Sequence, residues 1–85
     1  MKLNPFAMMN REPDGKGIVF DPGKNQALTL NDTGVVVWEA LENGLDVPQT
    51  IQRLVDEFDV TPDVAAKDLQ FFLDALKNEG LLAEE

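Results

Sequence analysis

The stretch that most constrains the fold is residues 26–41, where the spacing of apolar side chains changes from the period of a strand to that of a helix. Its first five residues alternate, with Leu28 and Leu30 on one face, which predicts a short strand with one apolar side. Asn31 and Asp32 favour a helix N-terminus, because a short side-chain oxygen can accept a hydrogen bond from an unpaired backbone N–H. A helical apolar stripe follows, made of Gly34, Val37, Trp38 and Leu41. We therefore predict a strand that runs directly into a helix carrying the only Trp.

Two turn signals precede this unit. Residues 13–17 read Pro-Asp-Gly-Lys-Gly and residues 21–25 read Asp-Pro-Gly-Lys-Asn, and both combine Gly, Pro and Asp in the manner of tight turns. The segments that they separate are rich in apolar and β-branched residues, so an antiparallel meander is predicted. Its strands cover residues 6–12, 18–20 and 26–30, after a loose lead-in over residues 1–5.

Three helices are predicted after the meander. The first covers residues 33–42 and stops at Asn43-Gly44. The second opens at Val47-Pro48, and the third opens at Thr61-Pro62, with Thr61 as its N-cap. The third helix ends at Glu79-Gly80, after which Leu81 and Leu82 are expected to fold back on the core. The expected fold class is α+β, a three-stranded antiparallel meander followed by three helices in a winged helix-turn-helix-like arrangement, forming one domain over residues 1–85.

The third helix carries two apolar stripes. The first is an ordinary core stripe and consists of Ala65, Leu69, Phe72, Leu73 and Leu76. The second consists of Val64, Phe71 and Ala75, with Asp68 beside them. Helix one has a weaker second pair, Val36 and Ala40. These second stripes are explained either by small helices that are apolar over a wide arc or by a groove beside helix three that accepts a peptide.

The composition argues against an enzyme or a metal site. The chain has no Cys, His or Tyr, which removes the commonest metal ligands, nucleophiles and general bases. The acidic run over residues 56–59 lacks the alternating acids and central Gly of a calcium loop. We therefore expect no catalysis, no cofactor and no metal. The chain also lacks a signal peptide pattern and an apolar run long enough for a membrane span, so a soluble cytoplasmic protein is expected.

The net charge of −9 is unevenly distributed. Residues 1–30 carry four basic and three acidic side chains, whereas residues 31–85 carry three basic and thirteen acidic ones. A winged-helix DNA-binding regulator is the alternative function for this order of elements. Its reading helix, residues 62–79, would have two Lys, no Arg and four acids, which disfavours contact with phosphates and base edges. We therefore expect no nucleic-acid partner.

The predicted third strand, Gln-Ala-Leu-Thr-Leu, would be an edge of the meander. Exposed edges are usually protected by charged residues or Pro, because their unpaired N–H and C=O groups can bind another chain. This strand has neither, so its backbone could accept an extended peptide by β-addition. A strand of five residues could equally be too short to need protection.

The order and spacing of several short motifs resemble the PqqD family. The resemblance covers nearly the whole chain from Ile18 onward, and the N-terminal strand matches least. The matching residues are Leu28-Thr29-Leu30-Asn31-Asp32-Thr33-Gly34, Trp38, Ile51, Leu54, Phe58-Asp59-Val60, Asp68-Leu69, Phe72-Leu73, Leu76 and Glu79-Gly80-Leu81-Leu82.

Members of this family are recognition domains without activity of their own. They bind the leader segment of a ribosomally made precursor peptide and present it to a modifying enzyme, a radical S-adenosylmethionine enzyme in pyrroloquinoline quinone (PQQ) biosynthesis. The resemblance implies that the leader adds as a strand beside Ala27, Leu28, Thr29 and Leu30 and lies against Val64, Asp68, Phe71 and Ala75. The precursor, the enzyme and the product are not indicated by the sequence.

Overall fold

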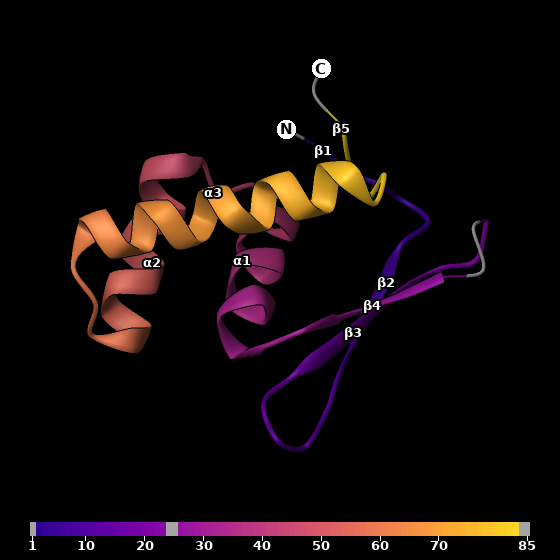
Figure 1. The fold of residues 1–85 in the computed structure, drawn as a ribbon, viewed down its shortest axis with the longest axis horizontal. Coiled ribbons are helices and arrows are strands. Elements are labelled where there is room, and N and C mark those ends of the chain that lie inside the picture. Colours follow the sequence, from indigo (N-terminus) through magenta and orange to yellow (C-terminus); the bar gives the residue numbers. More distant parts are fainter. Residues whose placement is uncertain (1, 24–25, 84–85) are drawn as a thin grey trace.

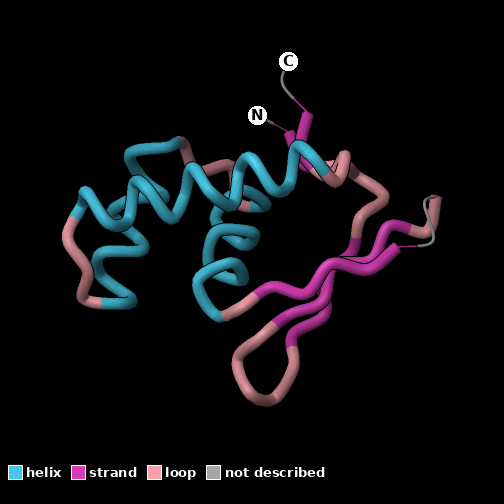
Figure 2. The backbone as a smooth tube through the Cα atoms, viewed as in Figure 1, coloured by secondary structure: helices cyan, strands magenta, loops and turns pink. Residues whose placement is uncertain are grey.

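The structure is a computed structural model that describes residues 2–23 and 26–83. A three-stranded antiparallel sheet precedes three helices, and a two-stranded pair joins the ends of the described chain (Figures 1 and 2). In chain order the elements are β1 (Lys2–Leu3), β2 (Met8–Arg11), β3 (Gly17–Asp21), β4 (Gln26–Leu30), α1 (Asp32–Glu42), α2 (Val47–Phe58), α3 (Pro62–Asn78) and β5 (Leu82–Ala83). The predicted α+β class, with a meander followed by three helices, is confirmed.

The three-stranded sheet has the order β2-β3-β4. Met9, Val19 and Leu28 are aligned across the three strands and contribute to the hydrophobic core, so this face of the sheet is the inner one. The tight turn between β2 and β3 forms as expected: the Asp14 carboxylate accepts a hydrogen bond from the Lys16 backbone N–H (3.0 Å) and Gly15 has a φ of +90°. Of the second predicted turn, Lys24 and Asn25 lie outside the described residues.

Helix α1 follows β4 at once and lies at the centre of the molecule (Figure 1). The Asn31 side-chain oxygen accepts a hydrogen bond from the Gly34 N–H (2.9 Å), which confirms the predicted N-cap. Trp38 is only 1% exposed. Val36 and Ala40 are also buried, so the second apolar pair of this helix belongs to the core.

Local signals set the ends of the other two helices. Asp46 and Gln49 form a reciprocal capping box at the start of α2, and Asp59, in the left-handed conformation, caps its C-terminus. The Thr61 hydroxyl caps α3 as predicted, and Gly80, with a φ of +71°, follows its last turn. Helix α3 packs against both α1 and α2, and Figure 1 shows it lying across them.

The prediction of a loose lead-in was wrong. Strand β1 pairs antiparallel with β5, the Asn4 N–H donates to the Leu81 carbonyl (2.8 Å), and Leu3 packs against the core. The two described ends of the chain therefore lie side by side (Figure 1). A pair of two-residue strands from opposite ends of a chain has no local periodicity, so the sequence pattern could not reveal it.

The first predicted strand also begins later than expected, at Met8. Phe6 lies in a turn and is 75% exposed. The Asn4 side-chain oxygen accepts a hydrogen bond from the Phe6 N–H (2.9 Å), and the Asn4 backbone carbonyl accepts one from the Ala7 N–H (3.1 Å). These bonds to Asn4 use the backbone groups that a strand ladder would need.

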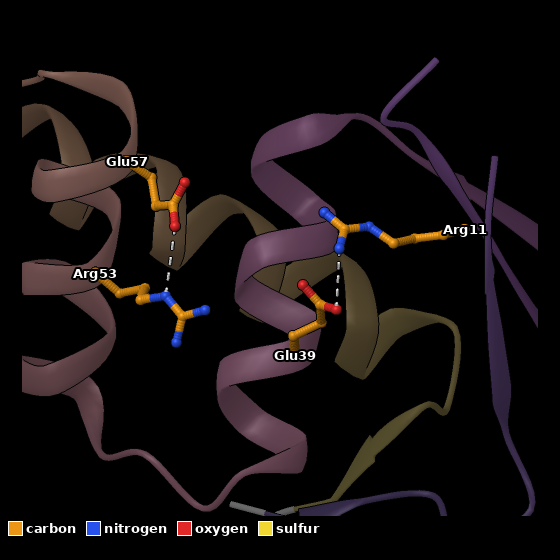
Figure 3. Close-up of polar contacts among 4 residues, drawn as sticks. All are labelled: Arg11, Glu39, Arg53 and Glu57. Atoms are coloured by element: carbon orange, nitrogen blue, oxygen red, sulfur yellow. Dashed lines mark ion pairs between the residues drawn. The ribbon is translucent and has the colours of Figure 1, made fainter. Parts of the chain in front are cut away.

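An ion pair between Arg11 and Glu39 connects the sheet to the helices. The Arg11 guanidinium at the end of β2 lies 3.5 Å from the Glu39 carboxylate on α1, whereas Arg53 and Glu57 pair within α2 at 3.8 Å (Figure 3). All four side chains remain partly exposed, and such surface pairs contribute little to stability, at most about 1 kcal/mol each. Glu39 nevertheless has a specific partner that the sequence did not indicate.

Candidate functional site

Strand β4 forms one edge of the three-stranded sheet, as predicted. Its register with β3 pairs Leu28 with Val19 and Leu30 with Gly17. Leu30 is buried and Leu28 is half-buried, whereas Ala27 and Thr29 are exposed. Within the described part of the chain no strand pairs with the other edge of β4, which carries neither a charge nor a Pro. That edge therefore offers backbone donors and acceptors to an additional strand.

The second stripe of α3 faces outward. Phe71 is 70% exposed and Val64 is 44% exposed, Asp68 is exposed, and Ala75 is half-buried. The core stripe of the same helix is buried, apart from the half-buried Phe72. Helix α3 thus covers the core with one face and presents apolar side chains, including a large aromatic ring, on another. Phe71 and Val64 on this face are exposed apolar side chains that a bound partner could cover.

A hollow of about 220 Å³ lies between α3 and the junction of β4 with α1. It is lined by Asn31, Thr33, Asp68, Phe71 and Phe72. The hollow therefore brings two of the predicted residues, Asp68 and Phe71, next to the end of β4. Val64 and Ala75 lie on other turns of the helix and do not line the hollow. The four predicted residues of β4, Ala27 to Leu30, do not line it either, and the strand ends one residue before Asn31.

Gly34 allows this close approach of α3 to the β4–α1 junction. A Cβ atom at Gly34 would lie 2.7 Å from Phe72 Cε1 and 3.2 Å from the Leu30 Cβ. The Phe72 ring therefore occupies the space that a larger residue at position 34 would fill. Phe71 meets it edge to face, with ring centroids 5.8 Å apart.

Asn31, Thr33 and Phe72 are lining residues that the sequence analysis did not assign to the site. Asn31 was interpreted as a helix cap and Phe72 as a core residue, and the structure confirms both roles while adding contact with the hollow. Thr33 carried no signal of its own. Its position three residues after the end of the edge strand was the only clue, since residues close to a peptide-binding strand can lie near the bound peptide.

The site is acidic. The part of the chain that the structure describes places no ion-pair partner on Asp68. Asp63 and Asp74 lie on the same helix. A carboxylate that is open to solvent beside apolar rings can attract a cationic group.

A larger hollow of about 640 Å³ lies elsewhere, on the side of the N-terminal segment. Leu3, Asn4, Pro5, Ala7, Trp38, Leu41, Glu42 and Gly44 line it. Its size alone does not make it the better candidate, because it adjoins neither β4 nor the exposed face of α3.

Among the described residues no group of three potential ligands is arranged to hold a metal ion. None of the helices in those ranges is long and apolar enough to cross a membrane.

Comparison with known proteins identifies the family. The family model described as coenzyme PQQ synthesis protein D (PqqD) matches residues 16–82. The chain belongs to the PqqD family. The matched region begins two residues before Ile18, where the resemblance in sequence begins. It does not include the first strand, which resembles the family least.

Two solved structures share the PqqD-like fold. One is TbiB1 in complex with the TbiA(beta) leader peptide, with a TM-score of 0.88 at 24% identity, covering 100% of this chain and 98% of that one. The other is a lasso peptide synthetase B1 complexed with the leader peptide, with a TM-score of 0.85 at 23% identity, covering 98% and 96% of the two chains. No curated protein matches the sequence.

Proposed function

We propose that this PqqD-family chain is a non-catalytic domain that binds the leader segment of a ribosomally made precursor peptide and presents it to a modifying enzyme. The observation that carries the proposal is the uncharged edge of β4, unpaired within the described chain, whose end adjoins the hollow lined by the exposed Phe71 of α3. The family match and the two similar folds, both solved in complex with a leader peptide, support it.

The leader would bind as a fourth strand of the sheet. Its backbone would pair with residues 27–30, and main-chain hydrogen bonds of this kind provide affinity without demanding a particular sequence. Alternate side chains of the added strand would then point toward α3 and contact Val64, Asp68, Phe71 and Ala75. Phe71 is the principal apolar anchor, because large exposed aromatic side chains contribute most to such interfaces.

The second partner would be the enzyme that modifies the precursor. The PqqD family is named for PQQ synthesis, for which a radical S-adenosylmethionine enzyme is the expected partner, whereas the second similar structure is a lasso peptide synthetase B1. We therefore propose a peptide-modifying enzyme as the partner and assign no pathway. The absence of His, Cys and Tyr from the sequence supports a role in recognition over one in catalysis. We also propose that residues 1–85 act as one domain in the cytoplasm.

An NMR titration tests the binding mode. A synthetic leader peptide from a precursor encoded close to this chain in the genome, if one is found there, should shift the amide signals of residues 26–30 and 64–75. Phe71→Ala should weaken binding by about 1–3 kcal/mol, since it removes the anchor, with little loss of fold because the ring is mostly exposed. Gln70→Ala is the matched control, because Gln70 is an exposed neighbour that bonds to Asp74 and does not line the hollow. Shifts confined to residues 6–12 or to α2 would place the peptide elsewhere and contradict this site.

A further inference from the structure

The hollow beside β4 combines one carboxylate with two aromatic rings. Asp68 and Phe71 lie three residues apart on α3, so their side chains share one face of the helix. Phe72, held in place against Gly34, supports the Phe71 ring edge to face. Asn31 and Thr33 line the opposite wall and bring further oxygen atoms.

The kind of side chain that can fill this hollow is limited by Asp68. Asp68 is exposed in the free chain, so an apolar side chain in the hollow would displace part of the water around its carboxylate without giving it a partner, which is unfavourable. A cationic side chain avoids this penalty, because its charge pairs with the carboxylate while its methylene groups lie on the rings. An aromatic face also attracts a cation directly.

The volume of the hollow is suited to one side chain and not to a larger ligand. About 220 Å³ is smaller than the roughly 300–1,000 Å³ of typical small-molecule sites. A single side chain that enters the hollow must belong to a backbone bound nearby. A strand added to β4 would provide such a backbone.

We propose that this hollow selects leader segments by accepting a basic side chain, with arginine preferred to lysine. The proposal rests on the proposed function, since it needs a leader strand on β4. The guanidinium would pair with the Asp68 carboxylate and lie over the Phe71 ring, and its planar, multiple-donor shape suits both contacts at once. The Asn31 and Thr33 side-chain oxygens would accept its remaining N–H groups.

A phage-displayed library of random 16-residue peptides, selected on the full chain, tests this specificity. The strongest binder is synthesised with its arginine and again with citrulline, a neutral residue of nearly the same shape. We expect the citrulline peptide to bind roughly tenfold more weakly to the unaltered chain. We expect Asp68→Asn to weaken binding of the arginine peptide by a similar factor and to change binding of the citrulline peptide less than about twofold.

Asp74→Asn is the matched control variant. It removes the same charge from the same helix, but Asp74 does not line the hollow and its bond from Gln70 can be kept by the Asn oxygen. It should leave the ratio between the two peptides unchanged. The fluorescence of the buried Trp38 reports whether either variant has lost its fold.

The outcomes separate this inference from the proposed function. If the selected peptides shift the amide signals of β4 and α3 but carry no basic residue, the proposed preference for a basic side chain is wrong and leader binding stands. The same holds if their binding does not change with Asp68→Asn. A selection that produces no binder, or binders whose shifts fall away from β4 and α3, would contradict the proposed function and this inference with it.

Discussion

At the scale of single residues, the junction between β4 and α1 is organised by a few close contacts. Asn31 caps the helix, Leu30 is buried beneath it, and Gly34 leaves room for the Phe72 ring. Glycine inside a helix is normally unfavourable by about 1 kcal/mol relative to alanine. Its presence here is therefore explained by packing, since any side chain at this position would meet Phe72 on one side and Leu30 on the other.

Gly34→Ala should lower stability despite the better helix propensity of alanine. The added Cβ would lie 2.7 Å from Phe72 Cε1, so the ring must move, and overpacking of this kind costs about 1–3 kcal/mol. After the helix gain of about 1 kcal/mol, a net loss of about 1 kcal/mol is expected in urea unfolding. Gly34→Ala should also weaken leader binding, because Phe72 lines the hollow. Equal or higher stability would show that position 34 has more space than the structure indicates.

Trp38→Ala tests the centre of the core. The side chain is 1% exposed and is among the largest fully buried ones in the described chain. Its removal should lower the free energy of unfolding by about 3–5 kcal/mol, a large fraction of the stability of a small domain. Denaturant titration followed by circular dichroism measures the change without relying on the deleted fluorophore. A loss below about 1 kcal/mol would contradict the central position of Trp38.

At the scale of elements, β4 and α3 each use one side in the fold and leave another side exposed. β4 is paired with β3 along one edge, and α3 covers the core with one stripe while Val64 and Phe71 face outward. Two neighbouring elements with open sides can bind one partner strand, which takes hydrogen bonds from the sheet and apolar contacts from the helix. The N-termini of the helices, in contrast, are capped by local side chains, and the contribution of such a cap to stability can be measured by itself.

Asp46→Ala should destabilise the protein through the start of α2. The Asp46 carboxylate accepts from the Gln49 N–H (2.8 Å), and the Gln49 side chain accepts from the Asp46 N–H (3.0 Å). Loss of such a cap costs about 0.5–2 kcal/mol, which chemical denaturation can resolve. Asp56→Ala is the control: it removes an equally exposed acid whose bond lies within the helix, and should change stability by less than about 0.5 kcal/mol. Equal effects of the two substitutions would argue against a specific cap.

At the scale of the whole molecule, charge and chain ends are arranged in a way that suits a peptide-binding module. The basic side chains are mostly in residues 1–30, and the helical part of the chain is strongly acidic. β1 and β5 hold the two described ends together, away from the sheet edge formed by β4. An acidic surface of this kind attracts basic peptides and repels phosphate backbones.

The chain should not bind duplex DNA at physiological salt, although its order of elements is compatible with a winged helix. The helix that would enter the major groove, α3, has no Arg and carries three Asp against two Lys, so it would be repelled by the phosphates that provide most non-specific affinity. Fluorescence anisotropy with a labelled duplex measures this directly. Micromolar binding of any duplex would restore the regulator as a candidate function.

The elements of this protein, and much of its core, follow from local sequence signals. The strand–helix junction at Asn31, the caps at Thr61 and Gly80, and the burial of Trp38 were all predictable, because capping and periodicity involve residues only a few positions apart. The β4 edge was predictable as well, since short turns leave little choice of strand order.

Only the tertiary structure could decide what those elements enclose. The pairing of β1 with β5, the ion pair between Arg11 and Glu39, and the hollow that joins Asn31 to Asp68 all connect segments that are distant in the chain. Periodicity shows which face of a helix is apolar, but not whether a neighbour covers it. The two second stripes demonstrate this: Val36 on α1 is buried and Phe71 on α3 is exposed, because packing partners cover the first and leave the second open to solvent.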